Sequence, residues 1–399
     1  MKQAVGEIPV VQQATKKKRP LAGSSRSLGF LVVFFLLFAL FVVPMGLANT
    51  LNTLMNTAYR LLVDTTLYIM AIAVLAGAIS ALLSEFGVIE LLNRLLSPLM
   101  KPLFGMPGAA ALGIVTTYLS DNPAILTLAD DQQYRRYFKA YQIPALTNLG
   151  TAFGMGLIVT TFMLGLGDSA GPHIALAALC GNLGAVIGSI LSTRLMLRST
   201  AKVMGKEAPA GMPAETAPRT AAGTAESSGG MRVMSALMEG GRKGVELGLG
   251  IIPGVLVICT LVMMLTNGAP ADGVYTGGAY EGIALLPAIA DKLDFLLKPL
   301  FGFSSAADIA VPVTALGSAG AALGVVPTLV QSGQANCNDI AVFTAMCMCW
   351  SGYLSTHVSM MDVLGCTHFT GKALLSHTLG GLLAGVAAHW LFVLFQLFL

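Results

Sequence analysis

The sequence predicts an all-α polytopic membrane protein with two inverted-topology repeats, each containing a re-entrant or broken helix segment, and an extra N-terminal transmembrane helix. Three observations support this fold class. Of the 399 residues, 55% are hydrophobic and only 11% are charged, whereas a soluble globular protein carries about 25% charged residues. Several apolar stretches are long enough to cross a bilayer, for which about 20 residues suffice. The two halves of the chain also resemble one another.

Seven apolar windows contain no Asp, Glu, Lys or Arg, as expected of segments surrounded by lipid, where charges are costly. The windows are residues 29–48, 65–84, 140–167, 170–193, 247–264, 340–361 and 373–399. The six cysteines lie in or beside these windows and form no C-x-x-C pair, so the spacing indicates no disulfide framework. We therefore expect a multi-pass protein of the cytoplasmic (inner) membrane.

The chain begins with a basic N-terminus, residues 1–28, which contains "TKKKRPLAGSSRS" directly before the first apolar window. A cleaved signal peptide is one interpretation, with "GLA" at 46–48 as a weak cleavage site. The long lead and the length of the apolar run favour a retained signal-anchor helix over 29–48. Such a helix would leave the N-terminus in the cytoplasm.

A segment rich in Ala, Pro, Gly, Ser and Thr, residues 199–230, divides the rest of the chain and is typical of a flexible linker. It separates a first repeat, 50–198, from a second repeat, 231–399. Both contain the pentapeptide "KPLFG", at 101–105 and at 298–302, followed by a small-residue segment and two further apolar windows. The shared order of elements predicts an internal repeat.

The distribution of Lys and Arg predicts the topology of the two repeats. If segment 107–129 enters the membrane from the cytoplasm and returns, the basic stretches that follow it stay inside. The same reasoning makes segment 306–330 enter from outside, so the repeats are inverted. Lys292 and Lys298 then lie outside, which counts against this topology. Inverted repeats with broken helices are typical of secondary transporters that bind solute near the midplane.

A polar cluster interrupts the first re-entrant segment: Ser120, Asp121 and Asn122, followed by Pro123. Irregular backbone at membrane depth is tolerated only where protein or a water-filled cavity satisfies it. Asp121 is the one carboxylate well inside an apolar segment, and such a residue indicates a proton, a cation or a polar substrate. The alternative is a tip near the membrane interface, where Asp121 caps the following helix.

Gly317 and Ser318 occupy the corresponding position in the second repeat. A glycine there would let a solute approach the backbone closely. Because Ser318 stands where the first repeat has Asp121, the site is expected to be asymmetric, with its charge coming from the first repeat.

Five further polar residues lie inside apolar windows: Asn148, Thr151, Asn182, His357 and His377. Asn148 and Thr151 are three residues apart and share a helix face, so they are candidates for lining the site. Each residue also has a packing interpretation. Asn and Thr side chains form hydrogen bonds between transmembrane helices, and a single buried His is more often satisfied in a core than functional.

The re-entrant segments, together with the Asn/Gly-rich helices "LTNLGTAFGMG" (146–156) and "CGNLGAVIGS" (180–189), resemble the nucleoside-recognition, or gate-domain, superfamily. That superfamily includes concentrative nucleoside transporters, the membrane part of bacterial ferrous iron transporters, and spore maturation proteins A and B. The two halves look like a fused spore maturation A/B pair. The resemblance implies a permease-like membrane domain and leaves the substrate undefined.

These features favour a secondary transporter, not an enzyme, that moves a small polar solute, nucleoside-like ones included, by alternating access. No resident cofactor or metal is expected, although a proton or Na⁺ could couple transport. The expected partners are the solute and the lipid bilayer, not nucleic acid, and the sequence leaves a homo-oligomer open.

Three alternatives remain. A divalent-metal (iron) permease could use "TAMCMCW" (344–350), although Cys347 and Cys349 are two residues apart and do not face each other on a helix. A membrane component of envelope or spore maturation would transport nothing itself. An intramembrane aspartyl protease would use "GLGD" (165–168), but Asp168 is expected in an outer loop and lacks a partner aspartate.

Overall fold

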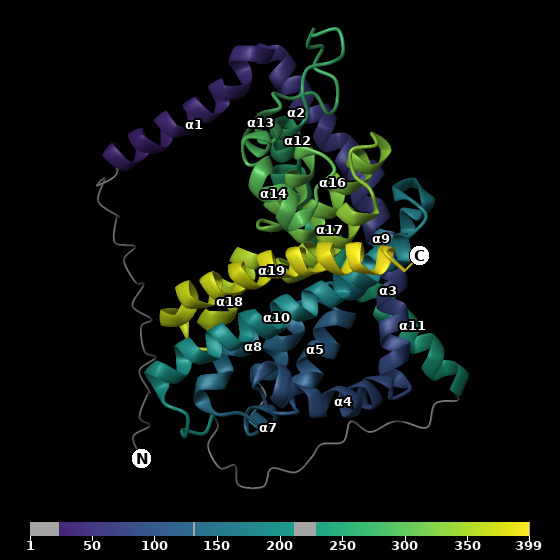
Figure 1. Ribbon diagram of the computed structural model, residues 1–399, viewed down its shortest axis with the longest axis vertical. Helices are drawn as coiled ribbons and strands as arrows, with labels where there is room; N and C mark the ends of the chain where they lie inside the picture. The colour runs from purple at the N-terminus through teal and green to yellow at the C-terminus, as the bar shows by residue number, and fades with distance from the viewer. Residues whose placement is uncertain (1–23, 131, 211–228, 399) are drawn as a thin grey trace, which may run out of the picture.

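The computed structural model describes residues 24–130, 132–210 and 229–398. Over these ranges the protein is helical and forms no β-strand (Figure 1). Six helical runs are long and apolar enough to cross a membrane, or seven if the sharply bent pair Asp294–Phe301 and Ala306–Ala315 forms one span. The chain is therefore an all-α polytopic membrane protein, as predicted. The basic N-terminus up to residue 23 and linker residues 211–228 lie outside the described residues.

The first repeat is preceded by α1, which spans Ser24–Met45 and extends away from the rest of the molecule (Figure 1). Only 11% of its apolar window is buried against the protein, as suits a helix surrounded by lipid. The helices that follow are α2 (Leu47–Arg60), α3 (Leu67–Glu85), α4 (Val88–Leu99), α5 (Ala110–Leu119), α6 (Pro123–Asp130), α7 (Gln132–Arg135), α8 (Ile143–Thr151), α9 (Gly156–Gly165) and α10 (Ile174–Met204).

The second half of the chain is also helical throughout most of its described length, and its correspondence to the first half as a repeat stays a prediction. Its helices are α11 (Gly229–Gly254), α12 (Thr260–Thr266), α13 (Leu285–Lys292), α14 (Asp294–Phe301), α15 (Ala310–Ala315), α16 (Ala319–Gln331), α17 (Cys337–Cys349), α18 (Tyr353–Val363) and α19 (Thr370–Gln396). The ends of α10 and α11 extend into the segment expected to be linker, so residues 199–204 and 229–230 are helical. The inverted orientation of the repeats stays a prediction.

The first polar cluster breaks the chain where the sequence predicts it. Helix α5 ends at Leu119 because Ser120 leaves helical geometry, and Pro123, which has no N–H to donate, begins α6. Helix α6 then folds back on α5, and Ile125 packs on the face of Gly113. The side chain of Ser120 donates to the Thr116 carbonyl at 2.6 Å, which satisfies an end carbonyl of α5.

A matching break in the second repeat separates α15 from α16. Ser318 adopts extended backbone and caps α16, its hydroxyl accepting a hydrogen bond from the Ala321 N–H at 3.2 Å. Ser, Thr, Asp and Asn are the preferred residues at this position. The two short helix pairs, α5–α6 and α15–α16, are called hairpin 1 and hairpin 2 below.

Two expected spanning segments are not continuous helices. A turn at residues 152–155 separates α8 from α9, with Met155 at a positive φ of 56°. The window 340–361 is likewise divided at Trp350–Gly352, where Gly352 has a φ of 64°, a conformation that favours glycine. The apolar window 340–361 therefore consists of two short helices and not of one continuous helix. Both interruptions lie beside the polar residues described below.

Helices from opposite halves pack in pairs, α3 with α11 and α10 with α19. Glycine permits the closest approach in both pairs: a Cβ atom at Gly240 would clash with the Gly77 backbone, and one at Gly188 would clash with the Gly380 carbonyl. Small residues are typical of such contacts between transmembrane helices. The repeats are thus interleaved, and the site between them depends on both.

Candidate functional site

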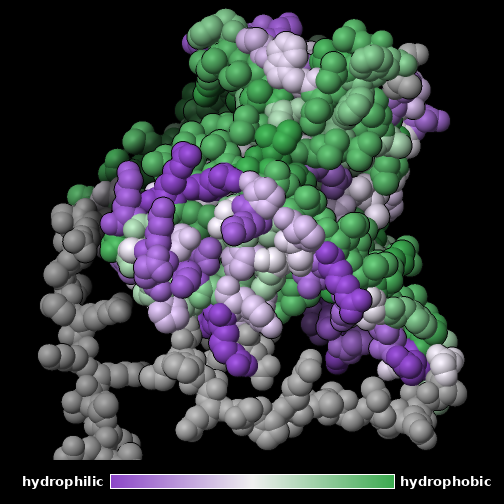
Figure 2. Space-filling view, turned by 60° about the horizontal axis from the view of Figure 1, so that its bottom comes forward, coloured by the Kyte–Doolittle hydropathy of each residue, from purple (hydrophilic) through white to green (hydrophobic). Residues whose placement is uncertain are grey.

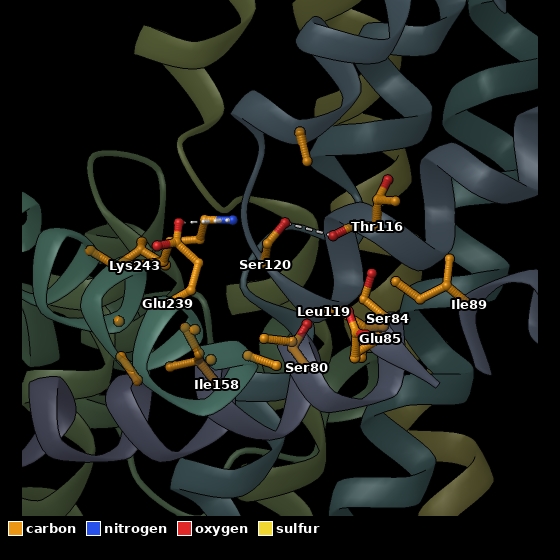
Figure 3. Close-up of a pocket in the computed structure, with 18 residues that line it drawn as sticks. Ser80, Ser84, Glu85, Ile89, Thr116, Leu119, Ser120, Ile158, Glu239 and Lys243 are labelled. Atoms are coloured by element: carbon orange, nitrogen blue, oxygen red, sulfur yellow. Dashed lines mark hydrogen bonds and ion pairs between the residues drawn. The ribbon is translucent and has the colours of Figure 1, made fainter. Parts of the chain in front are cut away.

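A cavity of about 420 Å³ lies between α3, α5, α9 and α11, beside the tip of hairpin 1 (Figure 3). Its walls are largely apolar, with polar groups from three elements. Those groups are Ser80, Ser84 and Glu85 from α3, Thr116 and Ser120 from hairpin 1, and Glu239 and Lys243 from α11. Mostly apolar walls with a few polar groups are typical of small-molecule sites.

Charges of both signs line this cavity. The Lys243 ammonium lies 3.7 Å from the Glu239 carboxylate, and both side chains stay partly exposed, so water screens their attraction. Glu85 forms an ion pair with Arg232, whose Nε donates at 2.6 Å. Figure 3 shows Ser120 and Lys243 facing the same space from different elements. A polar solute here would meet hydroxyl groups, an ammonium and a carboxylate.

Asp121 lines an adjoining hollow of about 450 Å³, together with Lys243, Glu246 and Ile251. The two spaces share wall residues, Ser120 and Lys243 among them. One carboxylate oxygen of Asp121 is buried and has no hydrogen-bond partner among the described residues. A buried acceptor without a partner is costly, so this oxygen is suited to a proton, a cation or a hydrogen-bond donor on a solute.

Asn122, the next residue, is bound to the protein. Its side-chain amide is 3% exposed and donates to the carbonyl of Ser351 at 2.6 Å and to the Ser351 hydroxyl at 3.0 Å. Ser351 lies in the break between α17 and α18. Two hydrogen bonds therefore connect the tip of hairpin 1, in the first half of the chain, to the break between α17 and α18 in the second half. We call this contact the latch.

A buried polar network lies on the other side of the same break. The amide of Asn148 donates to the hydroxyls of Ser192 (2.9 Å) and Ser376 (3.0 Å), and Ser192 is 2.9 Å from Nδ1 of His377. The other ring nitrogen of His377 contacts the carbonyl of Cys349, two residues before Ser351. Helices α8, α10, α17 and α19 are joined in this way.

His357 packs against His377, with ring centroids 4.6 Å apart. Its Nδ1 is 2.7 Å from the Tyr353 carbonyl, and its Nε2 is buried without a partner among the described residues. The sequence singled out Asn148, His357 and His377 separately, and the fold brings them into one cluster. The sequence did not single out Ser192 and Ser376 of this cluster, nor Ser351 of the latch. A serine inside an apolar helix is common, and only the "WSGY" break at 350–353 could have pointed to one of them.

The remaining candidates lie elsewhere. The Thr151 hydroxyl donates to the Thr147 carbonyl of its own helix at 2.7 Å. Asn182 bonds to Thr160 on α9 at 3.0 Å, which is a contact between packed helices. Gly317 lies against Ile258, and Ser318 lies against Gly254. Hairpin 2 therefore contacts the end of α11 and the turn that follows it.

Two alternative functions, a metal permease and an intramembrane aspartyl protease, would each need a particular set of side chains. Neither set is brought together among the described residues. No group of three or more His, Cys, Asp or Glu side chains is arranged there to hold a metal ion. All six cysteines are buried and free. Asp168 lies in a short helical turn, Gly167–Ala170, after the end of α9. These placements give no support to the metal-permease or protease alternatives.

Solved structures with a similar fold belong to a concentrative nucleoside transporter, CNTnw. An inward-facing, substrate-bound state of CNTnw is 15% identical, with a TM-score of 0.51 over 82% of this chain and 76% of that chain. A doubly substituted variant in an outward-facing state is 13% identical, with a TM-score of 0.53 over 94% and 86%. Another outward-facing variant gives a TM-score of 0.51 over 83% and 75%, at 15% identity.

No protein-family model matches the sequence, and no curated protein matches it either. At these identities the comparison shows the fold alone. The chain shares the fold of a concentrative nucleoside transporter, and the structures that share it are of a transporter and not of an enzyme. The predicted likeness to the spore maturation proteins stays a prediction.

Proposed function

We propose that this protein is a secondary transporter of a small polar solute with nucleoside-like chemistry, working by alternating access. The observation that carries the proposal is the cavity of about 420 Å³ walled by the tip of hairpin 1, in a fold shared with a nucleoside transporter. Its volume lies in the range of about 300–1,000 Å³ typical of small-molecule sites. Hydroxyl and carboxylate groups on its walls match the hydroxyls of a sugar.

Asp121 is the proposed coupling residue. Asp121 lines the hollow that adjoins the cavity, and one of its carboxylate oxygens is buried without a partner among the described residues. A proton or Na⁺ bound to Asp121 would therefore lie next to the solute. Lys243 lines both spaces, and its ammonium would compete electrostatically with a bound cation. Exchange between Lys243 and the ion at Asp121 is a physical route to coupling, because a buried carboxylate is stabilised by either positive partner.

The latch supplies the proposed moving part. Two hydrogen bonds hold the hairpin 1 tip to Ser351, and transporters of this kind move one unit past another around a site near the midplane. Breaking and re-forming two hydrogen bonds costs only a few kcal/mol, at about 0.5–1.5 kcal/mol net each. The latch can therefore break and re-form as the protein changes between its outward-facing and inward-facing states during a transport cycle.

A binding screen followed by an uptake assay tests the proposal. Purified full-length protein is heated with nucleosides, nucleobases, small acids and divalent metals, since a ligand that binds the native state raises the apparent melting temperature. The best ligand is then followed into proteoliposomes under an imposed Na⁺ or proton gradient. Stabilisation by a nucleoside together with gradient-driven uptake is expected.

Other outcomes would replace the proposal. Stabilisation by a divalent metal alone would favour the metal permease. If no ligand shifts the melting temperature and no solute accumulates, a non-transporting membrane component is the better description. The inner-membrane location, the cytoplasmic N-terminus and a homo-oligomeric state are parts of the proposal that fractionation, labelling and cross-linking would test separately.

A further inference from the structure

A second binding feature lies where the last turns of α10 run beside the first turns of α19. A groove of about 280 Å³ opens between them. Its polar rim is formed by Arg198 and Lys202 from α10 and Lys372 from α19, and no acidic residue lines it. All three cations are exposed.

The charges of these three side chains are not neutralised by carboxylates of the protein. Among the described residues, none of them forms an ion pair. Arg194, one turn earlier on α10, contrasts with them because its guanidinium donates to the carbonyls of Pro102 and Leu103. Lys372 lies 5.4 Å from the ring centroid of Phe369, which leaves its charge unneutralised. Three like charges gathered without a counter-charge attract an anion.

The other wall of the groove is apolar. Leu375 and Leu379 on α19 are 65% and 45% exposed, and Leu195 on α10 completes this wall. Helix α19 is a candidate membrane span, so the exposed leucines continue onto a surface that faces lipid. Hydrophilic residues gather toward the bottom of the molecule, whereas its flanks are hydrophobic (Figure 2). A cationic rim above an apolar wall matches a phosphate headgroup above an acyl chain.

We infer that the groove between α10 and α19 binds an anionic phospholipid of the cytoplasmic leaflet, through Arg198, Lys202 and Lys372 at its headgroup and through Leu375 and Leu379 along an acyl chain. Basic pockets between transmembrane helices on the cytoplasmic side are recognised sites for anionic headgroups. A free phosphate would use the cations but would leave the exposed leucines unexplained. Because α10 and α19 come from different repeats, a bound lipid would join the two halves.

The test uses the full-length protein in nanodiscs of phosphatidylcholine alone or mixed with phosphatidylglycerol. The readouts are the melting temperature and the number of bound phosphatidylglycerol molecules by native mass spectrometry. In the wild type, phosphatidylglycerol is expected to raise the melting temperature, and less so at high salt. A triple variant, Arg198→Gln, Lys202→Gln and Lys372→Gln, is expected to lose this rise, with affinity falling about fivefold per cation removed.

A matched control removes the same charge from the opposite end of the molecule, through Arg60→Gln, Lys292→Gln and Lys298→Gln, and should bind lipid as the wild type does. If the triple variant does not fold, Arg198→Gln is compared with Arg198→Lys; the glutamine variant should bind the lipid about fivefold more weakly, and the lysine variant should bind it nearly as the wild type does. Equal lipid binding by wild type and triple variant would overturn the inference. So would equal stabilisation by inorganic phosphate in phosphatidylcholine nanodiscs, which identifies a free-anion site instead.

Discussion

At the scale of single residues, two neighbours in one break have different surroundings. The side-chain amide of Asn122 donates two hydrogen bonds to Ser351, whereas Asp121 lines the hollow beside the cavity. Each residue also keeps one buried side-chain oxygen without a partner among the described residues. The position of Asp121 in the wall of the hollow, together with its buried oxygen, is what supports the proposed ligand or ion binding at this residue.

Asp121→Asn is expected to abolish uptake or to uncouple it from the ion gradient, with the protein still folded. The amide has nearly the same shape but cannot carry the charge, and losing one charge-dependent contact of about 1.5–3 kcal/mol corresponds to a drop on the order of ten- to a hundredfold. Uptake into proteoliposomes, measured across pH, checks the prediction. Asp168→Asn, at an exposed site after α9, is the matched control. Unchanged uptake and pH dependence in Asp121→Asn would exclude the coupling role.

The sequence pattern reveals some of the buried polar residues and not others. A carboxylate or amide in an apolar segment is rare, so Asp121, Asn122 and Asn148 stand out from the amino-acid pattern itself. Ser192 and Ser376 do not, because serine commonly bonds to its own helix. Ser376 does so here, donating to the Lys372 carbonyl at 2.8 Å, and also accepts from Asn148. Whether such a residue serves the helix or a network depends on what packs opposite it.

At the scale of elements, close helix contacts depend on individual glycines. Gly380→Ala on α19 is expected to destabilise the protein by about 1–3 kcal/mol, because the new methyl group would press on Ser192 and on the Gly188 carbonyl of α10. Gly371→Ala on the same helix is the control, since nothing lies within 4 Å of its Cβ position; it should be neutral or stabilising by up to about 1 kcal/mol. Unfolding in SDS measures both, and equal effects would contradict the proposed contact.

The loop between α12 and α13 is organised by one carboxylate. Glu281 is 7% exposed and accepts hydrogen bonds from the Thr276 hydroxyl at 2.5 Å and from the N–H groups of Thr276, Gly277 and Gly278. The Gly277 carbonyl in turn accepts from Asn56 on α2 at 2.8 Å. Burial by itself would raise the pKa of Glu281, but these hydrogen bonds outweigh it and lower the pKa below its ordinary value of 4.5.

This loop is therefore expected to loosen in acid. A lowered folded-state pKa means that the contribution of Glu281 to stability is complete above its ordinary pKa and is lost as pH falls through the lowered value. The protection factors of the backbone amides of residues 275–281 against hydrogen exchange should be high and constant at neutral pH, and should fall as pH drops below the ordinary Glu pKa of 4.5. At neutral pH the loop of the Glu281→Gln variant should exchange faster than that of the wild type, since a neutral amide accepts these bonds more weakly; the difference should shrink in acid, where Glu281 is itself neutral. Protection that does not change with pH would disprove the assignment.

At the scale of the whole molecule, the two halves of the chain meet in one region. The latch joins the repeats, and the network of Asn148, Ser192 and His377 joins them again. Neither half could form this region alone, because Asn122 and Asn148 both donate to acceptors in the other half. The proposed inverted orientation of the repeats would suit alternating access around such a region.

Labelling in intact cells tests that orientation. Ser84→Cys is expected to react with a membrane-impermeant maleimide only from the cytoplasmic side, and Asp272→Cys only from outside, because the positive-inside rule places them on opposite faces. Both positions are exposed, and the six native cysteines are buried, which keeps the background low. Labelling of both from one side would show that the predicted topology is wrong.

The sequence by itself determined the membrane class, the helical composition and the position of the first break, because these follow from local composition and from Pro123 and its polar neighbours. It did not determine the breaks inside 140–167 and 340–361, since apolar composition alone does not distinguish one long helix from two short ones. It also could not match Asn122 with Ser351, or Asn148 with Ser192 and Ser376. Those pairings join residues 44 to 229 positions apart, and only packing of the two repeats decides which buried donor meets which acceptor.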